Sequence, residues 1–229
     1  IDLAIPSERF TAADFKKYAV KKIAEIRGRG HVPFLVGGTG LYVDSVIYDY
    51  TFPDTNSHAG KRQQLEAMSL AELHDHCSKY NIILPENYKN RRYVINAILR
   101  NGQRLKRRSS PIANSIIVGI TTDKTTLRER IELRAEDIFI SETVDEALAS
   151  AEKYGWDNEA MTGNVYPLIR QYVAGTLAYD DAKRKFIALD WHLAKRQMTW
   201  LRRSEHITWL SLEDAYTYCA RALAKLNNS

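Results

Sequence analysis

Three glycines within four residues follow a short apolar run, and this junction constrains the fold more than any other part of the chain. The run covers residues 32–36 (VPFLV), and the turn after it reads Gly37-Gly38-Thr39-Gly40. The run is too short for a helix and rich in strand-forming residues, so it predicts a buried β-strand. Helices are expected before it, over residues 11–30, and after it, over residues 41–48. This order of elements is typical of a parallel α/β sheet.

The helix over residues 11–30 has recognisable ends. Thr11 is a candidate N-cap, and Asp14 stands three residues later, where a capping box places its acidic partner. Gly28 and Gly30 supply the stop. Its apolar residues recur at helical spacing and are Phe15, Ala19, Ile23 and Ile26.

The remaining chain predicts a helical insertion and a helical C-terminal region. Residues 54–114 are polar and helical in pattern, with a break near Leu84-Pro85. A short strand over residues 115–121 and a strand-like piece at 207–210 would rejoin the sheet. Helices are expected over residues 124–138, 142–154, 157–173 and 178–203 and at the C-terminus. We therefore expect three segments in the chain. Residues 1–53 form part of the α/β core, residues 54–114 form the insertion, and residues 115–229 form the rest of the core with the C-terminal helices.

Composition excludes several classes of protein. No apolar run of the 229 residues approaches the roughly 18 that a membrane helix needs. The two cysteines, Cys77 and Cys219, lie far apart, which favours a reducing compartment and a cytoplasmic protein. His74, His76 and Cys77 lie close together, but no second ligand set has the spacing of a zinc site. We therefore expect a polar helix face there and no metal site.

Positive charge is concentrated in one stretch. The net charge of the chain is +5, yet residues 87–122 contain no Asp or Glu and carry +8. A single-sign stretch of this length favours a polyanionic partner, RNA or DNA, and a basic surface without a partner is the alternative. The eight cations are Lys89, Arg91, Arg92, Arg100, Arg104, Lys106, Arg107 and Arg108.

A second basic segment, residues 181–203, contains aromatic side chains. Trp191, His192 and Trp200 lie among its cations, where they could stack on bases or belong to the core. We favour the core for Trp200, which shares one helical stripe with Phe186, Leu189 and Leu193.

The glycine turn lies within a longer string, residues 35–42 (LVGGTGLY), which closely resembles a signature of the tRNA dimethylallyltransferases, also called tRNA isopentenyltransferases. Residues 12–15 (AADF) and 194–202 (AKRQMTWLR) are similar to two further segments of that family. Arg130-Ile131 with Arg134, after residues 119–121, resembles the helix that follows its insertion. The resemblance runs in register from Ile1 to about Leu210.

This resemblance implies a P-loop-kinase-like parallel sheet core whose helical insertion grips the anticodon stem-loop of tRNA. It also implies transfer of a dimethylallyl group from dimethylallyl diphosphate to N6 of the adenine on the 3′ side of the anticodon. The adenine would be flipped out of its stack into a channel. Mg²⁺ and basic groups would neutralise the leaving diphosphate. A monomer working without a membrane is expected.

Two motifs of the family are missing from this chain. No G-x-x-x-x-G-K-[ST] sequence is present, and the front of the chain lacks the Asp-Ser motif whose Asp is the proposed general base of the family. In the family both precede the segment that resembles Ile1, so we expect an N-terminally truncated enzyme that is inactive by itself. The chain also departs from the family pattern in three shorter segments. Tyr93, Asn96 and Leu99 stand where the family has two arginines and a glutamate, and Leu168 stands where it has an acid. Asp190 and Trp191 stand where the family often has a Thr-Arg pair.

The resemblance assigns a role to each candidate site residue. Thr39 would orient the adenine amine or the base, although a hydroxyl that only caps its own helix is the alternative. Gly37, Gly38 and Gly40 would shape the channel wall. The other substrate-binding candidates are Tyr42, Arg62, Arg91, Arg92, Tyr166, Lys195, Arg196 and Gln197. Two other readings remain open, namely a different P-loop transferase or kinase and an RNA-binding module without an active site.

Overall fold

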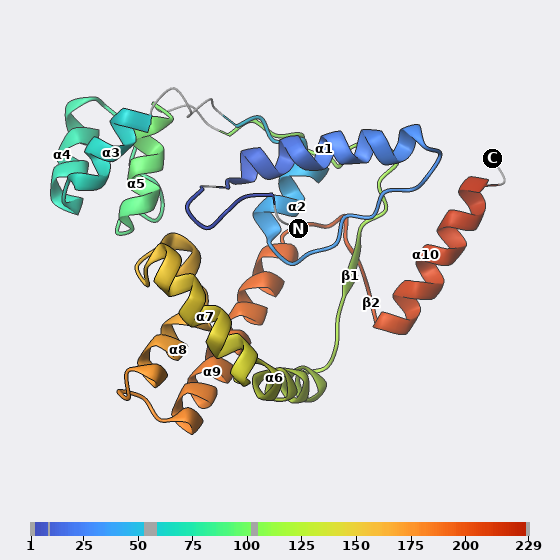
Figure 1. The fold of residues 1–229 in the computed structure, drawn as a ribbon. Helices are drawn as coiled ribbons and strands as arrows, with labels where there is room; N and C mark the ends of the chain where they lie inside the picture. The colour runs from blue at the N-terminus through green and yellow to red at the C-terminus, as the bar shows by residue number, and fades with distance from the viewer. Residues whose placement is uncertain (1–2, 9, 53–58, 102–104, 228–229) are drawn as a thin grey trace. The chain divides into compact units, whose positions relative to one another are not determined.

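A computed structural model describes residues 3–8, 10–52, 59–101 and 105–227. Two residues named above, Ile1 and Arg104, lie outside the described residues, as do the first residues of the expected insertion. The chain divides into two units, one formed by Ile1–Val43 with Ala113–Ser229 and the other by Asp44–Ile112. Each is described by itself below, with the elements labelled in Figure 1.

The first helix of the first unit confirms the capping prediction. α1 (Ala12–Gly28) begins after Thr11, whose hydroxyl accepts a hydrogen bond from the Asp14 N–H (3.3 Å), while the Asp14 carboxylate accepts one from the Thr11 N–H (2.9 Å). Gly30 follows the helix with a φ of +75°, a conformation that glycine adopts without strain. The expected ends of this helix are therefore correct to within two residues.

The buried strand predicted over residues 32–36 is wrong. These residues form neither helix nor strand, and Phe34 and Val36 are 67% and 89% exposed. A strand forms where a neighbour completes its backbone hydrogen bonds. The sheet among the described residues has two strands, β1 (Val118–Ile120) and β2 (Thr208–Leu210), and neither pairs with this run. Apolar composition alone therefore does not make the strand.

The two short strands that the sequence predicts are confirmed and pair in parallel. Val118 lies opposite Thr208, and Ile120 lies opposite Leu210. The last helix, α10 (Leu212–Asn227), packs beside both strands, as Figure 1 shows. This pairing agrees with the predicted α/β class, although helices make up most of the chain.

The helical C-terminal region packs around one apolar core. Its helices are α6 (Lys124–Ile138), α7 (Ser141–Tyr154), α8 (Tyr166–Val173) and α9 (Tyr179–Leu201). The single helix expected over residues 157–173 is instead a short 3₁₀-helix, Glu159–Thr162, followed by α8. Gly163 separates the two helices. The core residues are Ala135, Phe139, Ala147, Leu168, Ile169, Ala182 and Phe186.

The second unit has its own helical core. It contains α3 (Ala59–Ala67), α4 (Leu70–Lys79) and α5 (Arg91–Leu99), and the predicted break at Leu84-Pro85 lies between α4 and α5. The chain enters and leaves through paired segments, because the Thr51 N–H donates to the Lys106 carbonyl (2.8 Å) and the Arg108 N–H to the Tyr48 carbonyl (2.9 Å). The core residues are Leu65, Leu73, Cys77, Val94, Ile95, Ile98 and Leu99.

None of the helices in the described ranges combines the length and the apolar character that crossing a membrane requires.

Candidate active site at the glycine turn

The first unit brings the glycine turn against the second half of α9. A Cβ atom added to Gly38 would lie 2.5 Å from Nε2 of Gln197, and one added to Gly40 would lie 2.5 Å from Cγ of Trp200. Real Cβ atoms do not approach other atoms so closely, so a side chain at Gly40 would displace the Trp200 ring, whereas one at Gly38 would displace only the flexible end of Gln197. Two sequence motifs that are far apart in the chain therefore form one site. Around Gly37, by contrast, no atom lies within 4 Å of an added Cβ.

Thr39 lies in this turn at the start of α2 (Gly40–Ile47) and is exposed. Its carbonyl accepts hydrogen bonds from the N–H groups of Tyr42 (2.9 Å) and Val43 (3.2 Å). Its hydroxyl has no hydrogen-bond partner among the described residues, so the hydroxyl does not cap α2. A hydroxyl at a helix start, with glycines on both sides, is accessible to a ligand that approaches the main chain.

The α9 side of the site is basic. Lys195 and Arg196 are exposed, whereas Gln197 and Trp200 are half-buried. The guanidinium of Arg203 lies 5.2 Å from the ring centre of Trp200. Trp200 is thus packed between Gly40 and Arg203 and not in the helical core that was predicted for it. Leu189, on the same predicted stripe, is 38% exposed.

Two predicted substrate-binding tyrosines, Tyr42 and Tyr166, make contacts within the protein. Tyr42 stacks on Phe15 of α1, with ring centres 4.7 Å apart, and its hydroxyl donates to the Phe10 carbonyl (3.2 Å). Tyr166 lies in the helical region and donates a hydrogen bond to Glu146 of α7 (2.7 Å). That bond, together with burial, raises the pKa of Tyr166 to about 12. Both side chains therefore connect helices in this structure.

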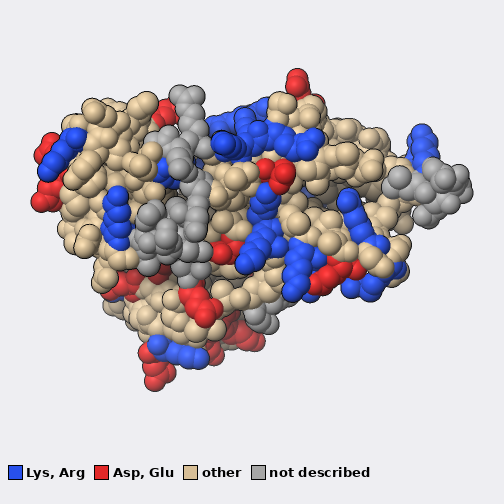
Figure 2. Space-filling model, turned by 90° about the horizontal axis from the view of Figure 1, so that it is seen from above, with Lys and Arg blue, Asp and Glu red and all other residues tan. Residues whose placement is uncertain are grey.

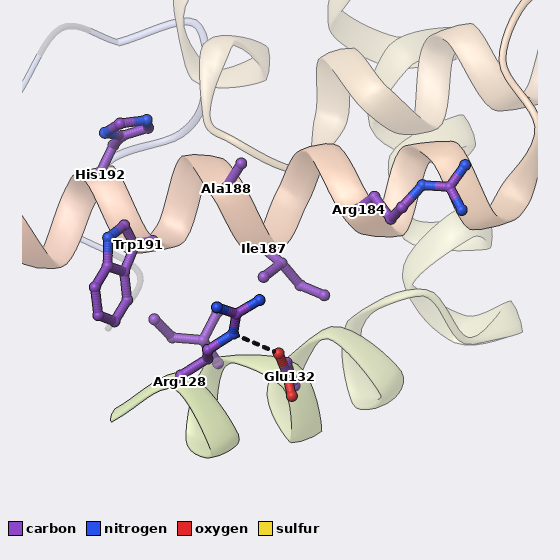
Figure 3. Close-up of a pocket in the computed structure, with 8 residues that line it drawn as sticks. Arg128, Glu132, Arg184, Ile187, Ala188, Trp191 and His192 are labelled. Carbon is purple, nitrogen blue, oxygen red and sulfur yellow. Dashed lines mark hydrogen bonds and ion pairs between the residues drawn. The ribbon is translucent and has the colours of Figure 1, made fainter. Parts of the chain in front are cut away.

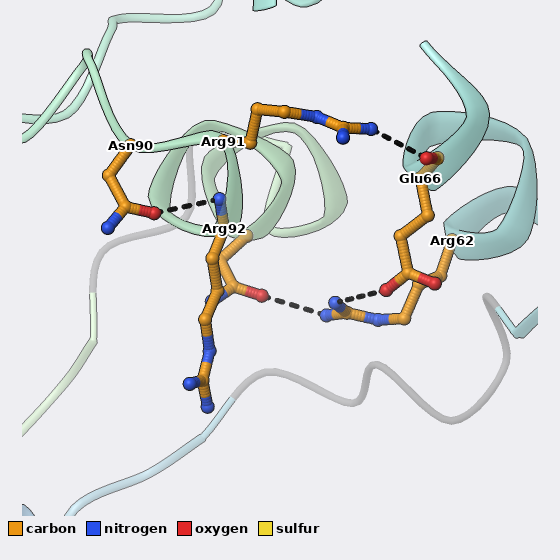
Figure 4. Close-up of polar contacts among 6 residues, drawn as sticks. Arg62, Glu66, Asn90, Arg91 and Arg92 are labelled. Carbon is orange, nitrogen blue, oxygen red and sulfur yellow. Dashed lines mark hydrogen bonds and ion pairs between the residues drawn. The ribbon is translucent and has the colours of Figure 1, made fainter. Parts of the chain in front are cut away.

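The three predicted arginines of the second unit differ in their surroundings (Figure 4). Arg62 is only 17% exposed, donates to Oδ1 of Asn96 (2.8 Å) and lies 3.5 Å from the Glu66 carboxylate. Arg91 is exposed and donates to the Glu66 carbonyl (2.6 Å). Arg92 is exposed, and its N–H is capped by Asn90 (3.1 Å) while its side chain extends away from that bond.

Other cations of the basic stretch also contact the protein. Arg107 lies about 6 Å from the ring centres of Tyr48 and Tyr50 and donates to the Tyr50 hydroxyl (3.1 Å). That hydrogen bond raises the pKa of Arg107 above its usual value. Arg100 donates to the Asn96 carbonyl (2.9 Å). Figure 2 shows one face of the molecule, on which Lys and Arg side chains (blue) lie among fewer Asp and Glu side chains (red).

Sequence reasoning missed one buried charge in the helical region. Asp190 is only 8% exposed, accepts a hydrogen bond from Asn164 (3.4 Å) and pairs with Arg134 of α6 (3.4 Å). In the sequence, Asp190 stands out only as a departure from the family pattern. Its position in a long helix beside Arg134 could not be inferred without the packing of α6 on α9.

The histidines and cysteine considered as metal ligands have separate contacts. His74 hydrogen-bonds to the Tyr88 carbonyl (2.8 Å), His76 packs on the Tyr80 ring, and Cys77 is buried in the core of its unit. The prediction that these residues form a polar helix face is therefore wrong for Cys77. Across the described ranges, no group of three or more His, Cys, Asp or Glu side chains could hold a metal ion.

Comparisons with known proteins agree with the resemblance in the motifs. The model of the IPP transferase family matches residues 1–204. A tRNA dimethylallyltransferase of Halalkalibacterium halodurans is 31% identical over 93% of this chain and 73% of its own length. One from Bacillus subtilis is 31% identical over 93% of this chain and 72% of its own length.

Solved structures are similar over nearly the whole chain. The full-length tRNA isopentenylpyrophosphate transferase from Bacillus halodurans matches with a TM-score of 0.68 and 29% identity, over 98% of this chain and 76% of that one. A tRNA isopentenylpyrophosphate transferase from Staphylococcus epidermidis matches with a TM-score of 0.67 and 26% identity, over 100% of this chain and 80% of that one.

Proposed function

Since this chain belongs to the IPP transferase family, we propose that it forms the adenine-facing part of an enzyme that prenylates tRNA. The reaction moves a dimethylallyl group from its diphosphate to N6 of the adenine on the 3′ side of the anticodon. The observation that carries the proposal is the close packing of Gly38 on Gln197 and of Gly40 on Trp200. That packing joins the two most distinctive motifs of the family in one site.

The chemistry needs an oriented amine and a stabilised leaving group. The N6 nitrogen attacks the dimethylallyl carbon, the carbon–oxygen bond to diphosphate breaks, and N6 loses one proton to a base. We assign the orientation of the amine to the exposed Thr39 hydroxyl. Lys195 and Arg196, exposed on α9, supply positive charge for the departing diphosphate. Gly37, Gly38 and Gly40 keep the wall of the channel free of side chains.

Mg²⁺ is expected from the family and would neutralise the diphosphate when bound. The residues that the structure describes do not fit it, because they offer no cluster of acidic or histidine ligands. No step of this proposal is therefore routed through the metal.

The second unit is proposed to hold the anticodon stem-loop. Lys89, Arg91 and Arg92 are exposed cations close together in sequence, in a stretch without acidic residues. Phosphate contacts by such side chains supply sequence-independent affinity. Arg62 is largely buried beside Asn96, so we assign it to the packing of α3 on α5.

Prenyl transfer to a stem-loop tests the proposal. The chain should transfer no labelled dimethylallyl group by itself, because the P-loop and the Asp-Ser motif that the family carries ahead of the residues resembling Ile1 are both missing from its front. With a segment that carries both motifs appended to its N-terminus, it should prenylate an anticodon stem-loop that has adenine at the target position. A matched stem-loop with guanine there lacks the N6 amine and should stay unmodified. Absence of transfer by the appended protein contradicts the proposal.

Binding to tRNA separates this function from its alternatives. The chain as it stands should bind the stem-loop, and affinity should fall as salt rises. Affinity that does not change with salt contradicts the phosphate contacts. Salt-dependent binding without transfer by the appended protein would instead favour an RNA-binding module. Transfer of phosphate from ATP would favour a kinase.

A further inference from the structure

A cavity of about 470 Å³ lies in the first unit between α6 and α9. It begins about one and a half helical turns before Gln197, at His192, and extends along α9 to Arg184. Its size falls in the range of pockets that hold small ligands. No role of the proposed prenyl transfer uses it.

The walls of this cavity combine an aromatic surface with apolar side chains. Figure 3 shows Trp191 and Ile187 projecting from α9 towards α6, and Arg128 projecting from α6 towards α9. Ile131 and Ala188 also line it. Trp191 is half-buried, so part of its ring is covered by protein and part stays open to a ligand. A flat apolar ligand fits against such a ring.

Two arginines at the rim of the cavity are paired with carboxylates that a ligand could replace. Arg128 pairs with Glu132 (3.0 Å), with side chains 71% and 48% exposed. Arg184 pairs with Asp181, with side chains 72% and 49% exposed. Exposed pairs of this kind contribute only about 0–1 kcal/mol, so an anionic ligand can replace the carboxylates. A guanidinium group can bind a phosphate through two parallel N–H groups, as it binds a carboxylate.

A ligand with a flat ring and an attached phosphate satisfies both parts of the cavity. We propose that it binds one unstacked nucleotide of single-stranded RNA, with its base on Trp191 and its phosphate on Arg128. RNA is favoured over a free nucleotide because exposed cations continue along the same helix at Lys195 and Arg196. The inference rests on the proposed function in one respect: it takes the bound RNA to be an unpaired part of the tRNA substrate.

The test uses the full chain and a short fluorescent single-stranded RNA, with binding measured by anisotropy. Trp191→Ala should weaken binding about fivefold or more, because a base stacked on an aromatic side chain contributes at least that much. Trp191→Phe should stay within about twofold, since it keeps a ring. Arg128→Gln should weaken binding and lower the dependence of log affinity on log salt by about 0.7. Arg221→Gln, an exposed cation on α10, is the matched control and should bind nearly as the unmodified chain does.

A photocrosslink locates the contact directly. RNA that carries 5-iodouridine should crosslink to Trp191 on irradiation, as read by mass spectrometry. Crosslinks confined to the second unit, or equal losses from Arg128→Gln and Arg221→Gln, would overturn the inference. A mononucleotide that binds Trp191 as tightly as the RNA would overturn the assignment to RNA.

The proposed function is tested separately. If the stem-loop binds the chain normally while Trp191→Ala and Arg128→Gln have no effect, this inference fails and the proposed function stands. If the stem-loop does not bind at all while the short RNA still crosslinks to Trp191, the proposed function fails and the nucleotide site stands.

Discussion

Gly40 lies directly against the indole of Trp200, with no room between them for a methyl group. The contact joins the start of α2 to the last turn of α9. It fixes the position of Thr39, the residue immediately before Gly40. The geometry of the candidate active site therefore depends on a residue that has no side chain.

Replacing Gly40 with alanine should disturb this contact. Gly40→Ala forces the Trp200 ring to move, and overpacking of this kind costs about 1–3 kcal/mol of unfolding free energy. Gly37→Ala is the matched control, because an added Cβ there meets no atom within 4 Å. Urea denaturation of both variants measures the difference. Equal stability of Gly40→Ala and Gly37→Ala would contradict the contact.

The hydroxyl of Thr39 should affect transfer but not folding. In the appended protein, Thr39→Val removes the hydroxyl with little change of shape and should lower kcat by about 100-fold, the usual effect of losing one oriented hydrogen bond at a reacting group. Thr39→Ser should retain most of the activity. Thermal unfolding of all three proteins should agree, since the hydroxyl has no hydrogen-bond partner among the described residues. A drop in melting temperature for Thr39→Val, in step with the loss of activity, would indicate a structural role.

The fold could be predicted where local sequence determines structure. α6 was expected over residues 124–138, and it forms over those residues because the Asp123 carboxylate accepts the Thr126 N–H at its start (2.9 Å). The run over residues 32–36 has a strand-forming sequence, yet its state depends on a pairing partner that the sequence does not specify. Local patterns identify helix caps, whereas strand pairing is a property of the whole fold.

The site was predicted in part for a similar reason. The motifs around Gly38 and Gln197 were recognised separately, and only the packing of the turn on α9 shows that they meet. Tyr42 and Tyr166 are predicted substrate contacts, and in the structure their hydroxyls bond to Phe10 and Glu146. A motif identifies which residues matter and does not distinguish a ligand contact from a structural one.

The two cysteines should differ in reactivity. Cys77 is buried in the core of the second unit, and burial raises the pKa of its thiol, which lowers the thiolate fraction at neutral pH. Cys219 is half-buried on α10. Ellman's reagent at pH 8 should therefore modify one thiol quickly and the second only after denaturant is added. In Cys219→Ser the fast phase should disappear; a fast phase that persists would mean that Cys77 is accessible.

The capping box of α1 should make stability depend on pH. The hydrogen bond from the Thr11 side chain is the main cause of the lowered pKa of Asp14. A carboxyl whose pKa is lower in the folded state stabilises the protein above its unfolded pKa, near 3.8, and this contribution is lost as pH falls through the folded value. Asp14→Ala should therefore cost about 1 kcal/mol at pH 7.

The difference in unfolding free energy between Asp14→Ala and the unmodified chain should shrink as the pH is lowered below about 4. Urea titrations at several pH values measure it. Asp75→Ala, an exposed aspartate in the middle of α4, is the control and should change stability by less than about 0.5 kcal/mol at every pH. A cost of Asp14→Ala that is the same at pH 7 and pH 3 would contradict the role of the charged carboxylate.

Two arginines of the second unit should separate RNA affinity from stability. Arg91→Gln removes an exposed cation, so it should reduce affinity for the stem-loop and lower the slope of log affinity against log salt by about 0.7–0.9. Arg62→Gln breaks the bond to Asn96 (2.8 Å) and leaves a polar group poorly paired in a mostly covered position, so it should lower unfolding free energy by about 1–3 kcal/mol. At a temperature where both variants are folded, the salt slope of Arg62→Gln should match that of the unmodified chain. Filter binding over a range of salt concentrations gives the slopes, and urea denaturation gives the stabilities. A reduced salt slope for Arg62→Gln, with unchanged stability, would show that Arg62 contacts phosphate and does not serve to hold α3 on α5.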